Sequence, residues 1–235
     1  MDPAAYYRAV VDAGCTAVEM ATQEHWPVAR QAGLGLLNIS GPGAGEGFNH
    51  VENHPLLLVE VRKTIELAAA NGVEQVIVFS GNSKGQAPRD GFKNCLEAFK
   101  GLAEVAREAG TTLLFEMFNT FDHPDYQASQ SSYGFELARA IDNPAFKVLY
   151  DVYHMYRMGE DVRQDLVANL EWIGHLHVAG GPKRDFPGSA QAIDYPSLVR
   201  DVQLAGYNGF WGLEFLSTGL QELSAAVKHL SMGCR

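Results

Sequence analysis

Hydrophobic and polar positions follow two alternating patterns along the chain. In residues 54–72 (HPLLLVEVRKTIELAAANG) and 92–110 (FKNCLEAFKGLAEVAREAG), apolar side chains recur at helical spacing and each run ends in glycine. Between such runs lie short, mostly apolar segments, for example 75–81 (QVIVFSG) and 111–119 (TTLLFEMFN). Segments of this length and composition are typical of buried strands. The pattern therefore predicts helices and strands in alternation.

The alternation extends over the whole chain. Strands are predicted over residues 16–20, 34–40, 75–81, 111–119, 146–155, 173–180 and 210–216, and helices over 3–13, 25–33, 54–72, 92–110, 134–142, 161–170, 195–207 and 220–230. Strands separated by helices of this length pair in parallel through crossovers. No linker-like composition divides the chain, so we expect one domain over residues 1–235 with an α/β, (β/α)₈ TIM-barrel fold. The first strand of such a barrel is missing from the pattern, which leaves an open seven-stranded sheet as the alternative.

Composition narrows the classes of protein to which the chain can belong. Hydrophobic residues make up 46% and charged residues 20%, as in ordinary globular proteins. The net charge of −10 argues against a nucleic-acid partner, which usually requires a basic surface. No signal peptide or transmembrane stretch is recognisable, so no membrane partner is expected. The three cysteines are far apart in sequence, which suggests a reducing compartment, and we expect a cytoplasmic protein.

Four consecutive predicted strands each end in a side chain that can bind a metal. These residues are Glu116, Asp151, His177 and Glu214. In a parallel barrel the carboxyl ends of all strands lie on one face, where active sites form. Three carboxylates and one imidazole suit a single divalent cation such as Mn²⁺, Mg²⁺, Co²⁺ or Zn²⁺. The sequence therefore predicts a metal site at this face.

Each of these residues also has a simpler interpretation. A single acidic residue at a strand end is more often a helix N-cap or an ion-pair partner than a functional group. The same position on four successive strands favours a site. His175, by contrast, is predicted to point to the opposite face of its strand and to pack beneath a helix.

Several stretches resemble a known family. Residues 113–119 (LLFEMFN), 150–155 (YDVYHM), 174–180 (GHLHVAG) and 194–215 are similar to the xylose isomerase-like TIM-barrel superfamily of sugar isomerases and epimerases. Within it, the hydroxypyruvate isomerase and ketose 3-epimerase branch is the most similar. The resemblance implies that the four strand-end residues bind one divalent metal and that Glu116 and Glu214 form the acid/base pair.

The resemblance also implies which residues contact the substrate. His154 matches a histidine that contacts substrate oxygens, and either Lys183 or Arg184 matches a basic residue with the same role. Two further positions come from the sequence itself: Asn119 either bonds a substrate hydroxyl or caps the next segment, and His50 either touches substrate or begins a helix. One departure is His177, because hydroxypyruvate isomerases often carry glutamine there, whereas histidine is common among epimerases.

The expected chemistry is removal of a proton from a carbon next to a carbonyl. A metal that chelates the carbonyl and the adjacent hydroxyl would stabilise the enediolate, and a glutamate would take the proton. We therefore expect an isomerase or epimerase acting on a small sugar or hydroxy-keto acid, without an organic cofactor. A dehydratase of the same superfamily, on a keto-inositol or dehydroshikimate, and a non-catalytic sugar-binding relative are the alternatives, and an apurinic endonuclease is disfavoured by charge. By analogy we expect a homo-oligomer, a dimer or tetramer.

Overall fold

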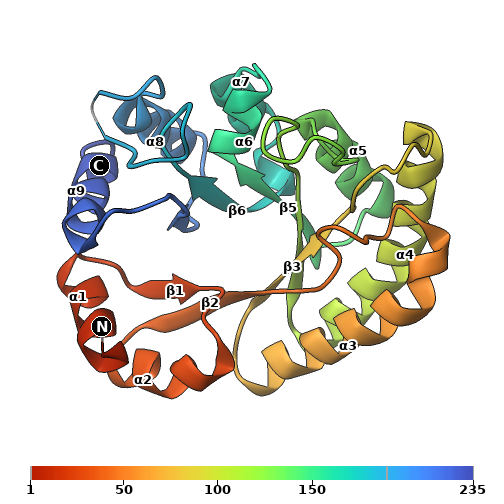
Figure 1. The fold of residues 1–235 in the computed structure, drawn as a ribbon, viewed down its shortest axis with the longest axis horizontal. Helices are drawn as coiled ribbons and strands as arrows, with labels where there is room; N and C mark the ends of the chain where they lie inside the picture. The colour runs from red at the N-terminus through yellow and green to blue at the C-terminus, as the bar shows by residue number, and fades with distance from the viewer. Residues whose placement is uncertain (1, 189, 235) are drawn as a thin grey trace.

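Seven parallel strands form one curved sheet with helices on its outer side (Figure 1). The structure is a computed structural model that describes residues 2–188 and 190–234. The strands are β1 (Ala17–Glu19), β2 (Gly35–Ser40), β3 (Gln75–Phe79), β4 (Thr112–Glu116), β5 (Phe146–Asp151), β6 (Ile173–Val178) and β7 (Trp211–Leu213). Each strand pairs in parallel with the next one in the chain. The expected α/β TIM-barrel-like fold is confirmed, with seven strands in a nearly closed barrel.

The helices cover the outer face of this sheet. They are α1 (Pro3–Asp12), α2 (Trp26–Gln31), α3 (His54–Ala70), α4 (Pro88–Ala109), α5 (Ser131–Ile141), α6 (Val152–Arg157), α7 (Val162–Ala168), α8 (Tyr195–Leu204) and α9 (Leu220–Ser231). Short 3₁₀ turns lie at Gln23–His25, Val51–Asn53 and Leu170–Trp172. Helix α4 begins at Pro88 and ends at Ala109, and the next residue, Gly110, has a φ of 73°. Proline at the first turn and a left-handed glycine after the last turn are the usual signals for these two ends.

The predicted strand over residues 146–155 is wrong in its second half. Strand β5 ends at Asp151, and residues 152–157 form helix α6. The Oδ1 atom of Asp151 accepts hydrogen bonds from the backbone N–H groups of Tyr153 at 2.7 Å and His154 at 3.2 Å. These bonds satisfy the free N–H groups of the first helical turn, so the chain turns into a helix directly after the strand.

Two hydrophobic layers hold the sheet in place. The larger core packs the helices against the outer face, with fully buried residues such as Ile65, Leu102 and Phe115. A smaller cluster fills the interior of the sheet and contains Ile77, Phe79, Leu114 and Leu149. Side chains two residues apart on a strand share a face. Residues that follow the interior positions by two, at the carboxyl ends of the strands, therefore also point into the interior.

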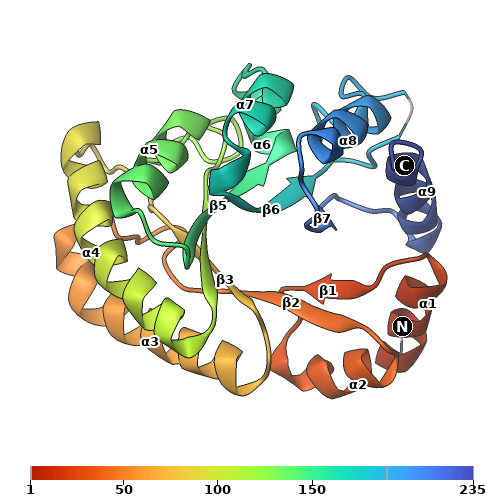
Figure 2. The same ribbon diagram turned by 180° about the vertical axis from the view of Figure 1, so that it is seen from behind.

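The sheet is open between its first and last strands. No pairing joins β1 to β7 within residues 2–188 and 190–234. A cavity of about 590 Å³ lies there, lined by Glu19, Glu214 and side chains of the flanking helices such as Tyr7 and Leu230. Helices α1 and α9 pack against each other, which brings the first and last helices together (Figures 1 and 2). Among all the residues that the structure describes, no helix is both long enough and apolar enough to cross a membrane.

The glycine-rich loop after β2 packs tightly against the loop after β3. The Gly45 carbonyl accepts a hydrogen bond from the Asn82 backbone at 2.9 Å, and the Ser80 carbonyl accepts one from Asn49 at 2.9 Å. A Cβ atom at Gly47 would overlap the backbone of Ser80 and Gly81. The two loops can approach this closely because residue 47 has no side chain.

Candidate metal and active site

The four strand-end residues converge at the carboxyl end of the sheet. Glu116 ends β4, Asp151 ends β5, His177 lies near the end of β6 and Glu214 follows β7. One ligand atom from each lies within 4.8 Å of the others. The Nδ1 atom of His177 is 3.0 Å from Glu214 Oε2 and 3.6 Å from Glu116 Oε1. Glu116, Asp151 and His177 are almost completely buried, whereas Glu214 is about one-third exposed, with 30% of its side chain accessible.

Asp151 serves two purposes with its two oxygens. Oδ1 caps helix α6, as described above. Oδ2 lies on the cluster side, 3.6 Å from His154 Nε2 and 3.7 Å from Arg184 Nη2. The capping interpretation and the functional interpretation of this residue are therefore compatible.

The cluster has the properties of a cation site. Glu116 Oε1, Asp151 Oδ2 and His177 Nδ1 are buried and have no hydrogen-bond partner among the described residues. Leaving such groups unpaired is costly, so a native arrangement of this kind usually has a partner. Ligands about 2.1 Å from one metal ion lie roughly 3.0–3.4 Å apart, close to the two distances measured from His177 Nδ1. The residues present therefore fit a divalent cation.

In the metal-free protein, the surroundings of the two glutamates shift their pKa values in opposite directions. Burial raises the pKa of Glu116 to about 7, and His177 only partly offsets this effect. Burial also acts to raise the pKa of Glu214, but the His177 ring and the charge of Arg184 outweigh it and lower the pKa to about 2. Burial acts to lower the pKa of His177, yet the surrounding carboxylates hold that pKa well above its ordinary value. Two carboxyl groups with separated pKa values are what acid/base chemistry requires.

His154 presents a hydrogen-bond donor to the cluster. Its Nδ1 atom accepts from the backbone N–H of Asn119 at 3.1 Å, so the proton of the neutral ring is on Nε2. Burial lowers the pKa of His154, which favours this neutral form. The Nε2 atom has no hydrogen-bond partner in the described part of the chain. The ring is therefore oriented with a free donor beside Asp151.

The side chain of Asn119 is engaged within the protein. It is fully buried, its Nδ2 atom lies 2.6 Å from His154 Nδ1, and its Oδ1 atom accepts from the backbone N–H groups of Phe121 and Asp122. Of the two expected roles, the contacts in the structure are those of a capping residue, and they also fix the ring of His154.

Of the two consecutive basic residues, Arg184 points into the site. Its Nη2 atom donates to Glu214 Oε2 at 2.6 Å, and its guanidinium lies 5.7 Å from the ring centre of Tyr153. Lys183 is exposed. The guanidinium therefore places a positive charge and several donors at the edge of the carboxylate cluster.

His50 lies outside the cluster. Its Nε2 atom is 3.0 Å from the carbonyl oxygen of Ser83, and its Nδ1 atom is 3.5 Å from Glu52. It precedes the 3₁₀ turn at Val51–Asn53, so its position is that of a residue at the start of a helical segment.

The prediction for His175 is wrong. His175 and His177 are two residues apart on β6, and such residues point to the same face of a strand. Both rings are fully buried in the interior, with centroids 5.0 Å apart, and both contact the carboxylate of Glu19. Glu19 is a polar residue that the strand-end argument missed, although it ends the predicted strand 16–20 in the same way as the other acids.

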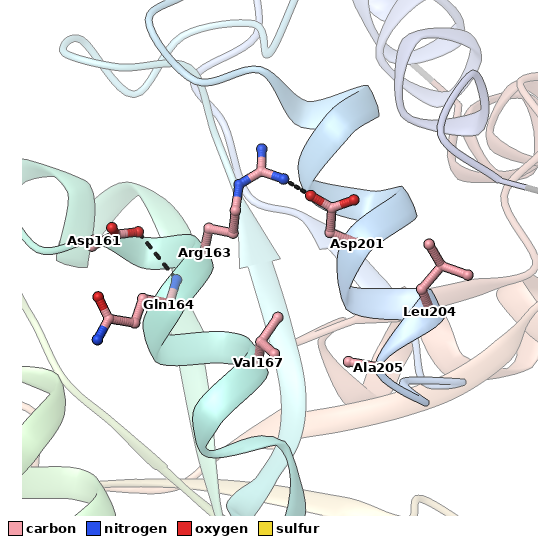
Figure 3. Close-up of a pocket in the computed structure, with 7 residues that line it drawn as sticks. All are labelled: Asp161, Arg163, Gln164, Val167, Asp201, Leu204 and Ala205. Carbon is pink, nitrogen blue, oxygen red and sulfur yellow. Dashed lines mark hydrogen bonds and ion pairs between the residues drawn. The ribbon is translucent and has the colours of Figure 1, made fainter.

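A second concave surface lies between α7 and α8, away from the strand ends (Figure 3). The ion pair between Arg163 and Asp201 crosses it, and Asp161 Oδ1 accepts from the backbone N–H of Gln164. The charged side chains of this surface therefore have partners within the protein. Val167 and Leu204 form the apolar part of the lining of this surface. The unpaired polar atoms described above are at the strand ends instead.

Comparison with known proteins identifies the family to which the chain belongs. The chain is 29% identical over 156 residues to 2-oxo-tetronate isomerase of Cupriavidus necator and 27% identical over 156 residues to hydroxypyruvate isomerase of Escherichia coli. Each match covers 66% of this chain but only 60% of the relative. The structure of D-psicose 3-epimerase with D-tagatose from Clostridium cellulolyticum superimposes with a TM-score of 0.83 at 17% identity, covering 100% of this chain and 95% of that one. Residues 7–231 match the family described as xylose isomerase-like TIM barrel, and the chain belongs to this family.

Proposed function

We propose that this protein is a divalent-metal-dependent isomerase or epimerase of a small sugar or hydroxy-keto acid, of the hydroxypyruvate isomerase or ketose 3-epimerase type. The observation that carries the proposal is the convergence of unpaired, inward-facing atoms of Glu116, Asp151 and His177 with the carboxylate of Glu214. The names of the two isomerase relatives support a keto-acid substrate, and the epimerase fold neighbour supports a ketose.

The same four residues would hold the metal. When bound, a divalent cation supplies Lewis-acid stabilisation to the negative charge of an enediolate. The donor set of three carboxylates and one imidazole suits Mn²⁺, Mg²⁺, Co²⁺ or Zn²⁺. The Arg184 guanidinium next to Glu214 limits the negative charge that the cluster carries.

Glu116 and Glu214 would move the proton. In the metal-free protein, burial raises the pKa of Glu116 to about 7, so the surroundings of this carboxylate favour the uptake of a proton, as a general base requires. Glu214 is held ionised by His177 and Arg184. Removal and return of the proton by carboxylates on opposite faces of a carbon would epimerise it, whereas transfer between adjacent carbons by one carboxylate would isomerise the substrate.

His154 and Arg184 would orient the substrate. The free Nε2–H of His154 can donate to a hydroxyl or carbonyl oxygen beside the metal site. The planar guanidinium of Arg184 can donate to a carboxylate, which is the group that distinguishes a keto acid from a free ketose. Lys183, which is exposed, would not take this role.

The test combines metal content with hydrogen exchange. The purified chain would be incubated with Mn²⁺ in D₂O with hydroxypyruvate, 2-oxo-tetronate or ketohexoses, and deuterium incorporation next to the carbonyl would be followed by NMR. We expect exchange with at least one substrate, reduced by about 100-fold or more in Glu116→Gln and Glu214→Gln at saturating metal. Glu108→Gln, an exposed glutamate on α4, is the control and should exchange like the wild type.

Other outcomes would contradict the proposal in distinct ways. Stoichiometric metal with loss of water from the substrate would identify a dehydratase. Metal binding without any reaction would favour a sugar-binding relative, and a chain that binds no divalent metal would remove the basis of the proposal.

A further inference from the structure

Glu19 is a nearly buried carboxylate that the proposed chemistry does not use. Its side chain is 15% exposed and lies at the end of β1, on the side of the sheet opening. Asn38 Nδ2 donates to its Oε1 atom at 3.1 Å, and His175 Nε2 contacts the same oxygen. Its Oε2 atom lies 3.5 Å from His177 Nε2. Burial of a carboxylate is costly unless other groups compensate for it, which indicates that Glu19 has a structural or functional role.

The two nitrogens of His177 face different carboxylates. Nδ1 faces Glu116 and Glu214, which belong to the proposed metal site, and Nε2 faces Glu19. His177 Nε2 is buried and makes no hydrogen bond among the described residues, and the negative charge of Glu19, 3.5 Å away, favours the ring proton on this nitrogen because an ionised carboxylate can only accept. The lone pair of Nδ1 is then directed at the cluster. In metal sites a carboxylate behind a histidine ligand commonly fixes its ring in this way.

Two features of the neighbouring strands β2 and β7 allow the Glu19 side chain to reach His177. The pairing of β1 with β2 shifts between Val18 and Glu19, so Glu19 lies opposite Asn38. Such irregularities redirect individual side chains. On the other side, a Cβ atom at Gly212 of β7 would overlap the Glu19 carboxylate and approach His177 Cδ2 to 2.7 Å. The absence of a side chain at residue 212 therefore allows the carboxylate to reach the ring across the sheet opening.

We infer that Glu19 is a positioning residue for His177, which sets the ring orientation and keeps Nδ1 available to the cation. His175 and Asn38 contact the other carboxylate oxygen of Glu19, Oε1, and so hold this side chain in place. The inference rests on the metal site of the proposed function, but it concerns the geometry of the ligand and does not depend on which substrate is converted.

The test measures metal affinity and the protonation of the ring, without substrate. Zn²⁺ and Mn²⁺ dissociation constants would be measured by calorimetry for wild type, Glu19→Gln, Glu19→Ala and Gly212→Ala. We expect Glu19→Ala to weaken binding by about 10- to 100-fold, the usual effect of removing such a partner. Glu19→Gln keeps one acceptor for Nε2–H and should weaken binding less. Gly212→Ala replaces no ligand and no carboxylate, yet it should weaken binding because the added methyl group displaces Glu19 and presses on the ring of His177.

A spectroscopic measurement separates positioning from a general loss of structure. In ¹⁵N-histidine-labelled protein loaded with Zn²⁺, His177 should show a protonated Nε2 and a metal-bound Nδ1. Glu19→Ala should abolish the slowly exchanging Nε2–H signal of His177. The signal of His175, which also contacts Glu19, should change as well, while histidines outside this group, such as His50, keep their spectra. The control is Glu160→Gln, which alters a half-buried carboxylate that accepts from Ser131 at 2.9 Å and should leave affinity and spectrum unchanged.

The results that would overturn the inference are specific. Unchanged metal affinity and an unchanged His177 spectrum in folded Glu19→Ala would contradict it, as would equal losses in Glu160→Gln. Two Zn²⁺ ions per chain, one of them lost in Glu19→Ala, would make Glu19 a ligand instead. Metal binding by the wild type without any exchange in D₂O contradicts only the proposed function, whereas absence of metal binding contradicts both.

Discussion

At the scale of single residues, the candidate site depends on side chains that make two contacts in different directions. Asp151 caps α6 with one oxygen and faces the cluster with the other. His177 lies between Glu19 and the cluster, and Asn119 holds both its own turn and the ring of His154. Because each of these residues is fixed from behind, the atoms that face the cluster have little freedom to move.

Substitution of Asp151 should separate its two roles. Asn retains an acceptor for the N–H groups of Tyr153 and His154 but removes the charge, so Asp151→Asn should lose metal affinity with little loss of stability. Asp151→Ala should lose the same affinity and, in addition, about 1 kcal/mol of the free energy of unfolding. Urea denaturation without metal and calorimetric titration with Mn²⁺ would measure the two quantities.

The control for Asp151 is a residue that only caps. Asp194 is exposed and accepts from the backbone N–H of Ser197 at the start of α8. Asp194→Ala should lose about 1 kcal/mol of stability while its Mn²⁺ affinity stays the same. Equal losses of metal affinity in the two alanine variants would contradict the assignment of Asp151 to the cluster.

The raised pKa of Glu116 predicts a pH dependence with a definite sign. Burial raises this pKa from 4.5 to about 7, so between these values the folded chain binds more protons than the unfolded chain. Its contribution to the stability of the metal-free protein should therefore fall as pH rises through this window. Metal binding must displace the same proton, so Mn²⁺ affinity should rise between about pH 5 and about pH 7. Calorimetry in buffers of different ionisation enthalpy would detect the released proton.

At the scale of helices and strands, the regular pattern of the sequence accounts for what could be predicted. Parallel strands bring their carboxyl ends to one face, so the convergence of Glu116, Asp151, His177 and Glu214 followed from strand order alone. Helix α6 was missed because residues 152–155 are apolar or aromatic and continue the strand pattern. The capping capacity of Asp151 was the local signal that could have identified it.

Contacts that depend on three-dimensional approach could not be predicted in the same way. The role of Glu19 depends on a shift in strand pairing and on the absence of a side chain at Gly212. Neither feature produces a periodic pattern of apolar and polar residues in the sequence. The choice between Lys183 and Arg184 depends on the path of the loop after β6. His175 is different, because correct use of the two-residue period would have placed it beside His177.

The contact between the loops after β2 and β3 gives a prediction at this scale. A methyl group at residue 47 would overlap the backbone of Ser80 and Gly81, so Gly47→Ala should lose about 2 kcal/mol or more of stability. Gly45 is in the same loop, and its nearest neighbour would be 4.0 Å from an added Cβ atom. Gly45→Ala should therefore stay within about 0.5 kcal/mol of wild type in urea denaturation. Equal stability of the two variants would contradict the close approach of the loops.

At the scale of the whole molecule, the opening between β1 and β7 is the main departure from a closed barrel. The cavity there reaches Glu19 and Glu214, so the least complete part of the sheet borders the candidate site. Glu19 and Gly212 meet across it, and His177 connects Glu19 to the cluster. A cation at the cluster would therefore tie together strands on both sides of the opening.

Hydrogen exchange should reveal this dependence. Amide groups of β1 and β7 have fewer strand partners than those of β4, so they should exchange faster in the metal-free protein. Added Zn²⁺ should slow exchange in β1 and β7, and a chelator should reverse the effect, while β4 serves as the internal control. Identical protection of all three strands with and without metal would contradict a link between the cluster and the opening.

The open edges of β1 and β7 also affect how the molecule behaves toward its own copies. A strand edge without a partner offers free N–H and C=O groups to any other strand, which is the first step of aggregation in many sheet proteins. In this protein the edges are short, three residues each, so each offers few free groups to a second molecule. The incomplete closure of the sheet therefore exposes little strand edge to pairing between copies of the chain.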